Sequence, residues 1–235
     1  AQITGGTTAI DTVVSVFSGS CGSLTEIGCD DDSGTNPGLS SRATVTLTRG
    51  QTYYVRVAGF GTAPATGAVS VMAIGGTGTL TINAVIAESG GAHNLTKSGT
   101  STLVLGNGAN SYTGTTTIAQ GTVVAAAADV LDNSAGLDLS VSGASFNLAG
   151  FDQTLTKLDG VAGTTVTNST AAVTDAATLT ISGNGGVFAG NLTQPGDDVL
   201  SFTKSGVGTQ TLSGGGNTFT GPTTVSGGVL KAGVA

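Results

Sequence analysis

The sequence predicts an all-β protein in which a partial antiparallel β-sandwich is followed by a β-solenoid. Composition gives the first indication, because 40 of the 235 residues are Gly and the rest is rich in Thr, Ser and Val, which favour strands and turns. Short segments of alternating hydrophobicity, separated by glycine-rich turns, occupy the first third of the chain. An internal repeat occupies the remainder, and such a repeat is typical of a structure that stacks similar units.

Charge and hydropathy exclude several classes of protein. The net charge is −7, with only seven Lys and Arg residues, whereas nucleic-acid binding requires basic side chains that displace counterions. The chain is 38% hydrophobic, which is too much for a disordered protein. No apolar run approaches the roughly 18 residues of a membrane span. No signal peptide is recognisable at the start, so we expect that a leader has been removed or that the chain begins inside a longer protein.

Residues 1–74 have the pattern of a small antiparallel domain. Strands are expected near residues 13–17, 24–27, 43–47, 53–57 and 69–72, separated by turns, as in a β-sandwich. The pattern changes at residue 75, after which Met and Arg no longer occur. We therefore predict two domains, residues 1–74 and residues 75–235.

The first domain resembles a known family. Residues 11–21 (DTVVSVFSGSC), 29–33 (CDDDS) and 50–59 (GQTYYVRVAG) are similar to the second half of a bacterial pre-peptidase C-terminal domain. The resemblance implies a secreted β-sandwich that binds or targets and does not catalyse. Members of that family have further strands before the first of these segments, but only ten residues precede it here. Edge strands are therefore expected to be open, with the missing strands supplied by a longer chain or another subunit.

The second domain contains a long internal repeat. Residues 96–123 align without a gap to residues 203–230, and 13 of the 28 positions are identical. Each unit is too short and too poor in apolar residues to fold alone, whereas stacked units bury a continuous core. At roughly 20–25 residues per turn, residues 75–235 predict about seven turns. The positions that stay apolar in both copies are expected to point inward: Leu105, Ile118, Val123, Leu212, Val225 and Leu230.

The repeat also resembles a family. Its Thr96-Lys97-Ser98-Gly99 start, the NSYTGTTTI segment at residues 110–118 and the second copy are similar to the autotransporter-associated β-strand repeat. The resemblance covers about residues 78–232. It implies a right-handed parallel β-helix of the passenger type, on the bacterial cell surface or secreted from it. Membrane anchoring through this chain is not expected.

The two cysteines are candidates for a disulfide. Cys21 and Cys29 are close in sequence, with turn-forming residues between them. An even number of cysteines at hairpin spacing indicates a disulfide bond in an oxidising compartment. The alternative is a pair of buried thiols.

The only cluster of charge is a candidate cation site. Asp30, Asp31 and Asp32 are adjacent, and their carboxylates repel one another unless they are solvated or bridged by a cation. Calcium prefers such oxygen ligands, so the alternatives are a calcium site and a solvated acidic turn. Asp197 and Asp198 follow Pro195-Gly196 and are expected in a solvated turn.

No residues form a recognisable catalytic set. The single histidine, His93, has no partners at a known spacing and is expected in a surface loop. Asp32-Ser33-Gly34 has the letters of the aspartic-protease triplet but lacks the apolar residues that should precede it. The glycine clusters are not followed by a helix, so they are not phosphate-binding loops. We predict that the chain is not an enzyme and needs no cofactor, apart from the calcium alternative.

Two functions remain. The first is an extracellular or cell-surface structural protein, a stalk or fibre-forming subunit that self-associates through open strand edges or joins neighbouring domains of a longer chain. The second is an adhesin or carbohydrate-binding passenger fragment that contacts a glycan or another cell-surface ligand. Exposed aromatic residues would favour the second, and the candidates for that role are few: Tyr112, Phe151 and Phe219.

Overall fold

The regular elements of the described part of the chain are all strands. The computed structural model describes residues 2–5, 12–20, 22–33, 41–48, 51, 53–59, 69–72, 78–88, 91–170 and 175–233. All 23 elements in these ranges are strands, which confirms the predicted all-β class. The described part of the chain accordingly contains no helix that is long and apolar enough to span a membrane.

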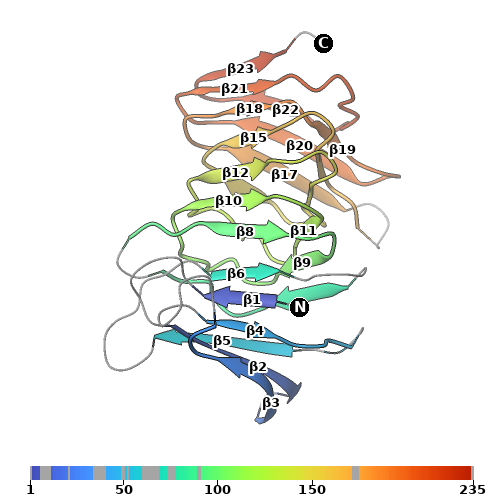
Figure 1. The fold of residues 1–235 in the computed structure, drawn as a ribbon. Helices are drawn as coiled ribbons and strands as arrows, with labels where there is room; N and C mark the ends of the chain where they lie inside the picture. Colours follow the sequence, from blue (N-terminus) through green and yellow to red (C-terminus); the bar gives the residue numbers. More distant parts are fainter. Residues whose placement is uncertain are drawn as a thin grey trace.

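The largest sheet has ten strands and runs along the solenoid from β23 to β4 (Figure 1). Eight of its strands are consecutive parallel neighbours: β6 (Val69–Met72), β8 (Leu95–Ser98), β10 (Thr115–Ile118), β12 (Gly136–Leu139), β15 (Leu158–Gly160), β18 (Val187–Phe188), β21 (Thr209–Leu212) and β23 (Val229–Ala232). At the N-terminal end, β1 (Gln2–Gly5) pairs antiparallel with both β6 and β4 (Arg42–Thr44).

Two further parallel sheets complete a solenoid. The six-stranded sheet contains β7 (Thr79–Ile82), β9 (Thr102–Leu105), β11 (Thr122–Ala125), β13 (Ser145–Asn147), β16 (Thr165–Thr167) and β19 (Asn191–Thr193). The four-stranded sheet contains β14 (Gln153–Leu155), β17 (Ala176–Ile181), β20 (Val199–Lys204) and β22 (Thr223–Val225). From β12 to β20 the chain visits the ten-, six- and four-stranded sheets in turn; before β12 it alternates between the ten- and six-stranded sheets, and after β20 between the four- and ten-stranded sheets. The solenoid has about seven turns, as predicted.

The turns are stacked in register. Thr96, Thr117, Asp138 and Asp159 are consecutive partners in the ten-stranded sheet and lie 21 residues apart. Parallel pairing without a shift places each side chain above its counterpart in the previous turn. One inward column of the six-stranded sheet is entirely apolar: Leu80, Leu103, Val123, Phe146, Val166 and Leu192.

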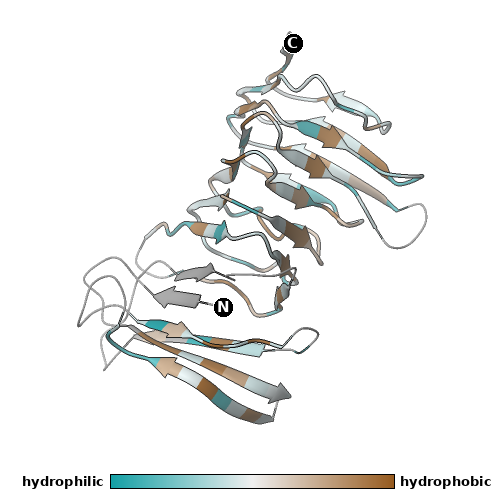
Figure 2. Ribbon diagram, turned by 45° about the vertical axis from the view of Figure 1, so that its right-hand side comes forward, coloured by the Kyte–Doolittle hydropathy of each residue, from teal (hydrophilic) through white to brown (hydrophobic). Residues whose placement is uncertain are grey.

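The interior is a continuous aliphatic core with few aromatic rings. Hydrophobic and hydrophilic residues alternate along the strands (Figure 2), as expected when one side of each strand faces the core. Leu105, Ile118 and Val123 are buried, which confirms their predicted orientation. In the second copy, Leu212 and Leu230 are partly buried against the same core, whereas Val225 is 50% exposed. The prediction was wrong for Val225, because it lies in β22, at the edge of its sheet, where no described strand covers it.

The N-terminal region adds a small antiparallel sheet. Its strands are β3 (Ser23–Asp30), β2 (Thr12–Ser20) and β5 (Tyr53–Gly59), in that order, and each overlaps a strand expected from sequence. A separate core lies there, formed by Val14, Val16, Ala43 and Val45. The division of the chain at residues 74 and 75 stays a prediction, since β6 precedes that point and pairs with β8 beyond it.

Candidate functional site

Each copy of the repeat places a lysine inside the solenoid. Lys97 is only 4% exposed, and it follows Leu95 on the inward side of β8. Its Nζ donates to the carbonyl oxygens of Ser98 at 3.0 Å, Gly99 at 2.6 Å and Gln120 at 3.0 Å. An ammonium has three donors, so these bonds satisfy all of them. The first two acceptors belong to the same turn of the solenoid and the third to the next, so the ammonium joins two successive corners.

The second copy has a similar arrangement, with two bonds in place of three. Lys204 is fully buried, and its Nζ donates to Gly206 O at 2.5 Å and to Gly183 O at 3.2 Å in the previous turn. Burial of an ammonium is costly unless hydrogen bonds compensate for the lost water, and carbonyl acceptors supply that compensation at both positions. Burial lowers the pKa of Lys97. The lysines therefore act as structural corner residues.

A glycine completes the corner in both copies. Gly121 and Gly228 have φ of +75° and +64°, a conformation that other residues rarely adopt. A Cβ at Gly121 would lie 2.5 Å from Gly99 O and 2.9 Å from Lys97 Nζ, and one at Gly228 would lie 2.3 Å from Gly206 O. The repeated glycine thus leaves room for the next corner to approach the carbonyls that surround the ammonium.

The two copies lie on different faces of the solenoid. The first copy alternates between the ten-stranded sheet (β8 and β10) and the six-stranded sheet (β9 and β11). The second alternates between the four-stranded sheet (β20 and β22) and the ten-stranded sheet (β21 and β23). The repeat therefore encodes a corner and its two flanking strands, and it is not tied to a particular face.

Other buried polar side chains replace missing backbone partners. Gln210 is fully buried, and its Nε2 donates to Leu158 O at 2.9 Å while its Oε1 accepts from Leu158 N at 3.3 Å. This pair of bonds resembles the pairing of two strand residues. It connects β21 to β15 across the intervening strand β18, which has only two residues. Asn168 acts similarly, donating to the Asp175 and Val199 carbonyls. Sequence analysis did not identify these residues, because an isolated Gln or Asn has no recognisable spacing.

Tyr112 is buried, so its candidacy as an exposed aromatic was wrong. Its hydroxyl lies 2.8 Å from Thr116 Oγ1, which in turn lies 3.2 Å from Ser134 Oγ. Burial raises the pKa of Tyr112 to about 12. Phe219 also packs against the core, and Phe151 is 39% exposed.

The structure gives no support to the predicted disulfide. Cys29 has a free, exposed thiol, and the Glu26 carboxylate raises its pKa. Cys29 pairs with Ser15, whereas Ser20 and Ser23 pair at the end of the same hairpin. Cys21 lies outside the described residues, so its pairing stays a prediction.

The acidic run forms a turn. Burial opposes ionisation of Asp30, but hydrogen bonds from Ser33 and from Arg42 N outweigh it and lower the pKa of this carboxyl. These bonds engage both carboxylate oxygens of Asp30. No group of three or more acidic, His or Cys side chains converges as a metal site among the described residues, and the calcium alternative at Asp30, Asp31 and Asp32 stays a prediction.

Two other polar residues were assigned to surface turns by sequence. His93 lies in the loop before β8, half-buried, and its backbone N donates to Glu88 Oε2 at 2.8 Å. The expectation of a solvated turn was wrong for Asp198, which is 4% exposed. Its carboxylate accepts from Thr170 N at 2.9 Å and Asp175 N at 3.1 Å, and these bonds lower its pKa. Asp198 thereby fixes both ends of the segment between residues 170 and 175.

The outer surface of the six-stranded sheet is uncharged and rich in hydroxyl groups. We call it the hydroxyl face. It consists of two columns in register, the first formed by Thr79, Thr102, Thr122, Ser145, Thr165 and Asn191 and the second by Thr81, Val104, Val124, Asn147, Thr167 and Thr193. The outer surface of the ten-stranded sheet differs, because Asp138 and Asp159 are stacked there and Lys157 pairs with Asp159 at 2.7 Å.

Comparison with known proteins agrees with this architecture. Residues 95–125 and 202–232 both match the Passenger-associated-transport-repeat family. These ranges contain the two corner lysines and the two corner glycines. The chain carries two passenger repeats.

A curated relative extends the similarity beyond the passenger repeats. Over 176 residues, or 74% of this chain, it is 37% identical to the adhesin BmaC autotransporter of Brucella suis biovar 1 (strain 1330). The match spans 5% of the length of that relative. The predicted passenger-type β-helix is confirmed, and so is the predicted location on the cell surface or outside the cell.

We expect the corner lysines of the passenger repeats to stabilise the solenoid. Lys97→Met keeps the apolar stem but leaves three carbonyls of the corner without their donor, which should lower the free energy of unfolding by about 1–3 kcal/mol. Lys204→Met should act in the same direction. Chemical denaturation measures the effect, and Lys231→Met, at an exposed position of the last strand, serves as the control. Equal stability of the Lys97→Met and Lys231→Met proteins would contradict the role of the buried ammonium.

Tyr112 should make stability depend on alkaline pH. Its pKa is about 12 in the folded chain and about 10 when unfolded, so the unfolded chain loses the phenol proton first. The stabilisation from the neutral buried phenol is complete below pH 10 and disappears between pH 10 and 12, amounting to about 3 kcal/mol. Unfolding measured between pH 8 and 11.5 should show this decline, and Tyr112→Phe should remove that part of it. An identical decline in both proteins would refute the assignment.

Proposed function

We propose that this chain is a non-enzymatic section of a surface-displayed adhesin and that it contacts its ligand through the hydroxyl face. One observation carries the proposal: the two columns of that face continue over six strands without a charged side chain. Such a surface offers donors and acceptors at a constant strand spacing of about 4.8 Å and has no charge to desolvate on contact. Neutral glycans on a cell surface have the matching chemistry.

The interior argues for a display scaffold. The buried polar groups described above, including Lys97, Lys204 and Gln210, are bonded to backbone groups and are not directed at a common cleft. A catalytic site needs nucleophile, base and acid within reach of one substrate atom, and no such grouping occurs among the described residues. The name of the relative supports adhesion as the role of this passenger segment.

Adhesion can be tested with charge placed on one face at a time. Beads coated with the chain should bind to epithelial cells or to arrayed neutral glycans. Thr122→Lys with Thr165→Lys, in the centre of the hydroxyl face, should reduce binding several-fold by forcing a charge into the contact. Thr180→Lys is the matched control, since Thr180 has the same partial exposure on the four-stranded sheet. Unchanged binding of the double variant, or an equal loss in the control, would reject the hydroxyl face as the contact surface.

Self-association into fibres is a second candidate, favoured by the apolar edge formed by β22 and β23. Val225 and Val229 are 50% and 52% exposed there, and open parallel edges can pair with further strands.

Sedimentation velocity at increasing concentration tests self-association. Oligomers should form and should disappear in the Val225→Lys/Val229→Lys variant, because buried lysines would oppose the contact. Val207→Lys, at a turn residue that is 88% exposed, should leave them intact. A monomer at all concentrations would exclude assembly through this edge.

A further inference from the structure

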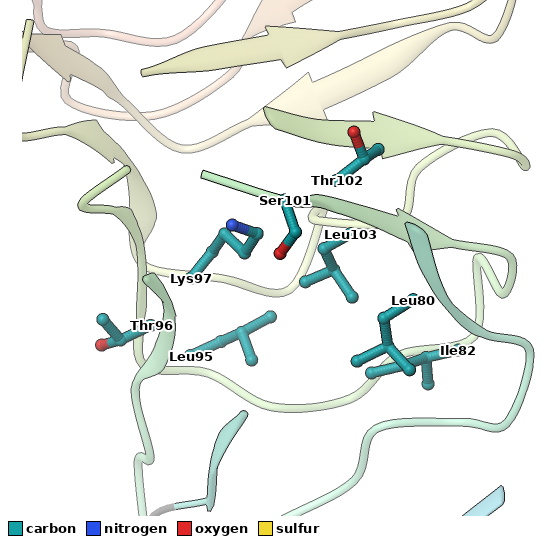
Figure 3. Close-up of a pocket in the computed structure, with 8 residues that line it drawn as sticks. All are labelled: Leu80, Ile82, Leu95, Thr96, Lys97, Ser101, Thr102 and Leu103. Atoms are coloured by element: carbon teal, nitrogen blue, oxygen red, sulfur yellow. The ribbon is translucent and has the colours of Figure 1, made fainter. Parts of the chain in front are cut away.

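A small cavity lies inside the solenoid near its N-terminal end. It has a volume of about 20 Å³ and is bounded by side chains of β7, β8 and β9 (Figure 3). Most of its wall is apolar, formed by Leu80, Ile82, Leu95 and Leu103. The polar residues Thr96, Lys97, Ser101 and Thr102 also line it.

The hydroxyl of Ser101 has no partner. Ser101 is 4% exposed, and its Oγ is buried without a hydrogen bond to any described residue. Lys97 does not donate a hydrogen bond to this hydroxyl, because the three donors of its ammonium are engaged by the carbonyls of Ser98, Gly99 and Gln120. A buried hydroxyl without a partner is unfavourable, and in native proteins such groups are commonly satisfied by ordered water.

A glycine lies beside Ser101 in the previous turn. Thr79 is the partner of Thr102, so Gly78 occupies the position next to Ser101, one residue earlier on each strand. A Cβ at Gly78 would meet no atom within 4 Å. The carbonyl of Gly78 accepts a hydrogen bond from Thr102 N at 2.9 Å and keeps a second lone pair.

Later turns fill the same corner differently. In register with Ser101, β13 is preceded by Ala144 and β16 by Thr164. Ala144 has no polar side-chain atom, and Thr164 Oγ1 donates to Val161 O at 2.7 Å. Only at Ser101, among these three positions, does the corner leave a hydroxyl unsatisfied.

We propose that this cavity is a binding site for one internal water molecule. The cavity is large enough, since one water molecule needs a cavity volume of roughly 10–15 Å³. Ser101 Oγ is its main hydrogen-bond partner, and the free lone pair of the Gly78 carbonyl is a second. The water joins the first two turns of the solenoid, where their apolar side chains leave a gap.

Serine-to-alanine substitutions test the proposal against two matched controls. Ser134 is buried and its Oγ donates to Gly114 O at 2.7 Å, so Ser134→Ala should lower the melting temperature. Ser142 is exposed, and Ser142→Ala should not. If Ser101 is bonded to water, Ser101→Ala should lower the melting temperature by about 2–4 °C, as Ser134→Ala does. A melting temperature equal to or above that of the parent protein would show that the hydroxyl has no water partner and would overturn the proposal.

A second variant changes the residue beside Ser101. Gly78→Ala adds a methyl group next to the proposed water, so it should lower the melting temperature in the parent protein. The loss should be smaller in the Ser101→Ala background, where the water has already lost its main partner. If Gly78→Ala raises the melting temperature of the parent, the cavity is dry and the proposal fails. A high-resolution crystal structure provides the direct readout, which should show an ordered water within 3.2 Å of Ser101 Oγ.

Discussion

In-register parallel pairing is the constraint on which the rest of this structure depends. Once each turn of the solenoid sits directly above the previous one, every inward position becomes part of a column and every corner lies beside another corner. Apolar columns are then easily packed, because Leu, Val, Ile and Phe can stack on one another along the axis. Corners are harder to satisfy, because the backbone leaves its sheet there and its carbonyl groups must find other donors.

The buried polar residues supply hydrogen-bond partners for these backbone groups. Lys97 and Lys204 bring donors to crowded corner carbonyls, Gln210 supplies a donor and an acceptor where a strand is too short, and Asn168 bridges two segments. Each acts on the backbone, and each lies in or beside a column of apolar neighbours. In the column of Lys204, for example, Ile181 precedes and Val225 follows it. A slim solenoid with few aromatic side chains thus uses long polar side chains to tie its turns together.

Much of this architecture could be predicted from the sequence, for reasons that concern local pattern. The repeat of residues 96–123 at 203–230 indicated stacking, and the period-two alternation located the strands and the inward residues Leu105, Ile118 and Val123. The same alternation places Lys97 on the side of Leu95, but a charged residue is usually assigned to the surface, so its burial was missed. Val225 and Asp198 were misjudged because their exposure depends on which strands and loops lie beside them. Such information is absent from any short window of sequence.

The candidate sites also depend on strand register, which the sequence does not give. Cys29 lies opposite Ser15 with a free thiol, whereas Cys21 is outside the described residues, so the disulfide stays a prediction. The hydroxyl face could not be anticipated, since its columns join residues more than 20 positions apart, such as Thr102, Thr122 and Ser145. It becomes visible only when the register of the whole stack is known.

The different placement of the two passenger repeats has a consequence for how such proteins diversify. Because one copy folds at the junction of the ten- and six-stranded sheets and the other at the junction of the four- and ten-stranded sheets, duplicating the unit does not duplicate a display surface. In this chain the two copies therefore present their loops in different directions around the solenoid. A solenoid lengthened by such a unit would present different loops at its surface and keep the same corner hydrogen bonds inside.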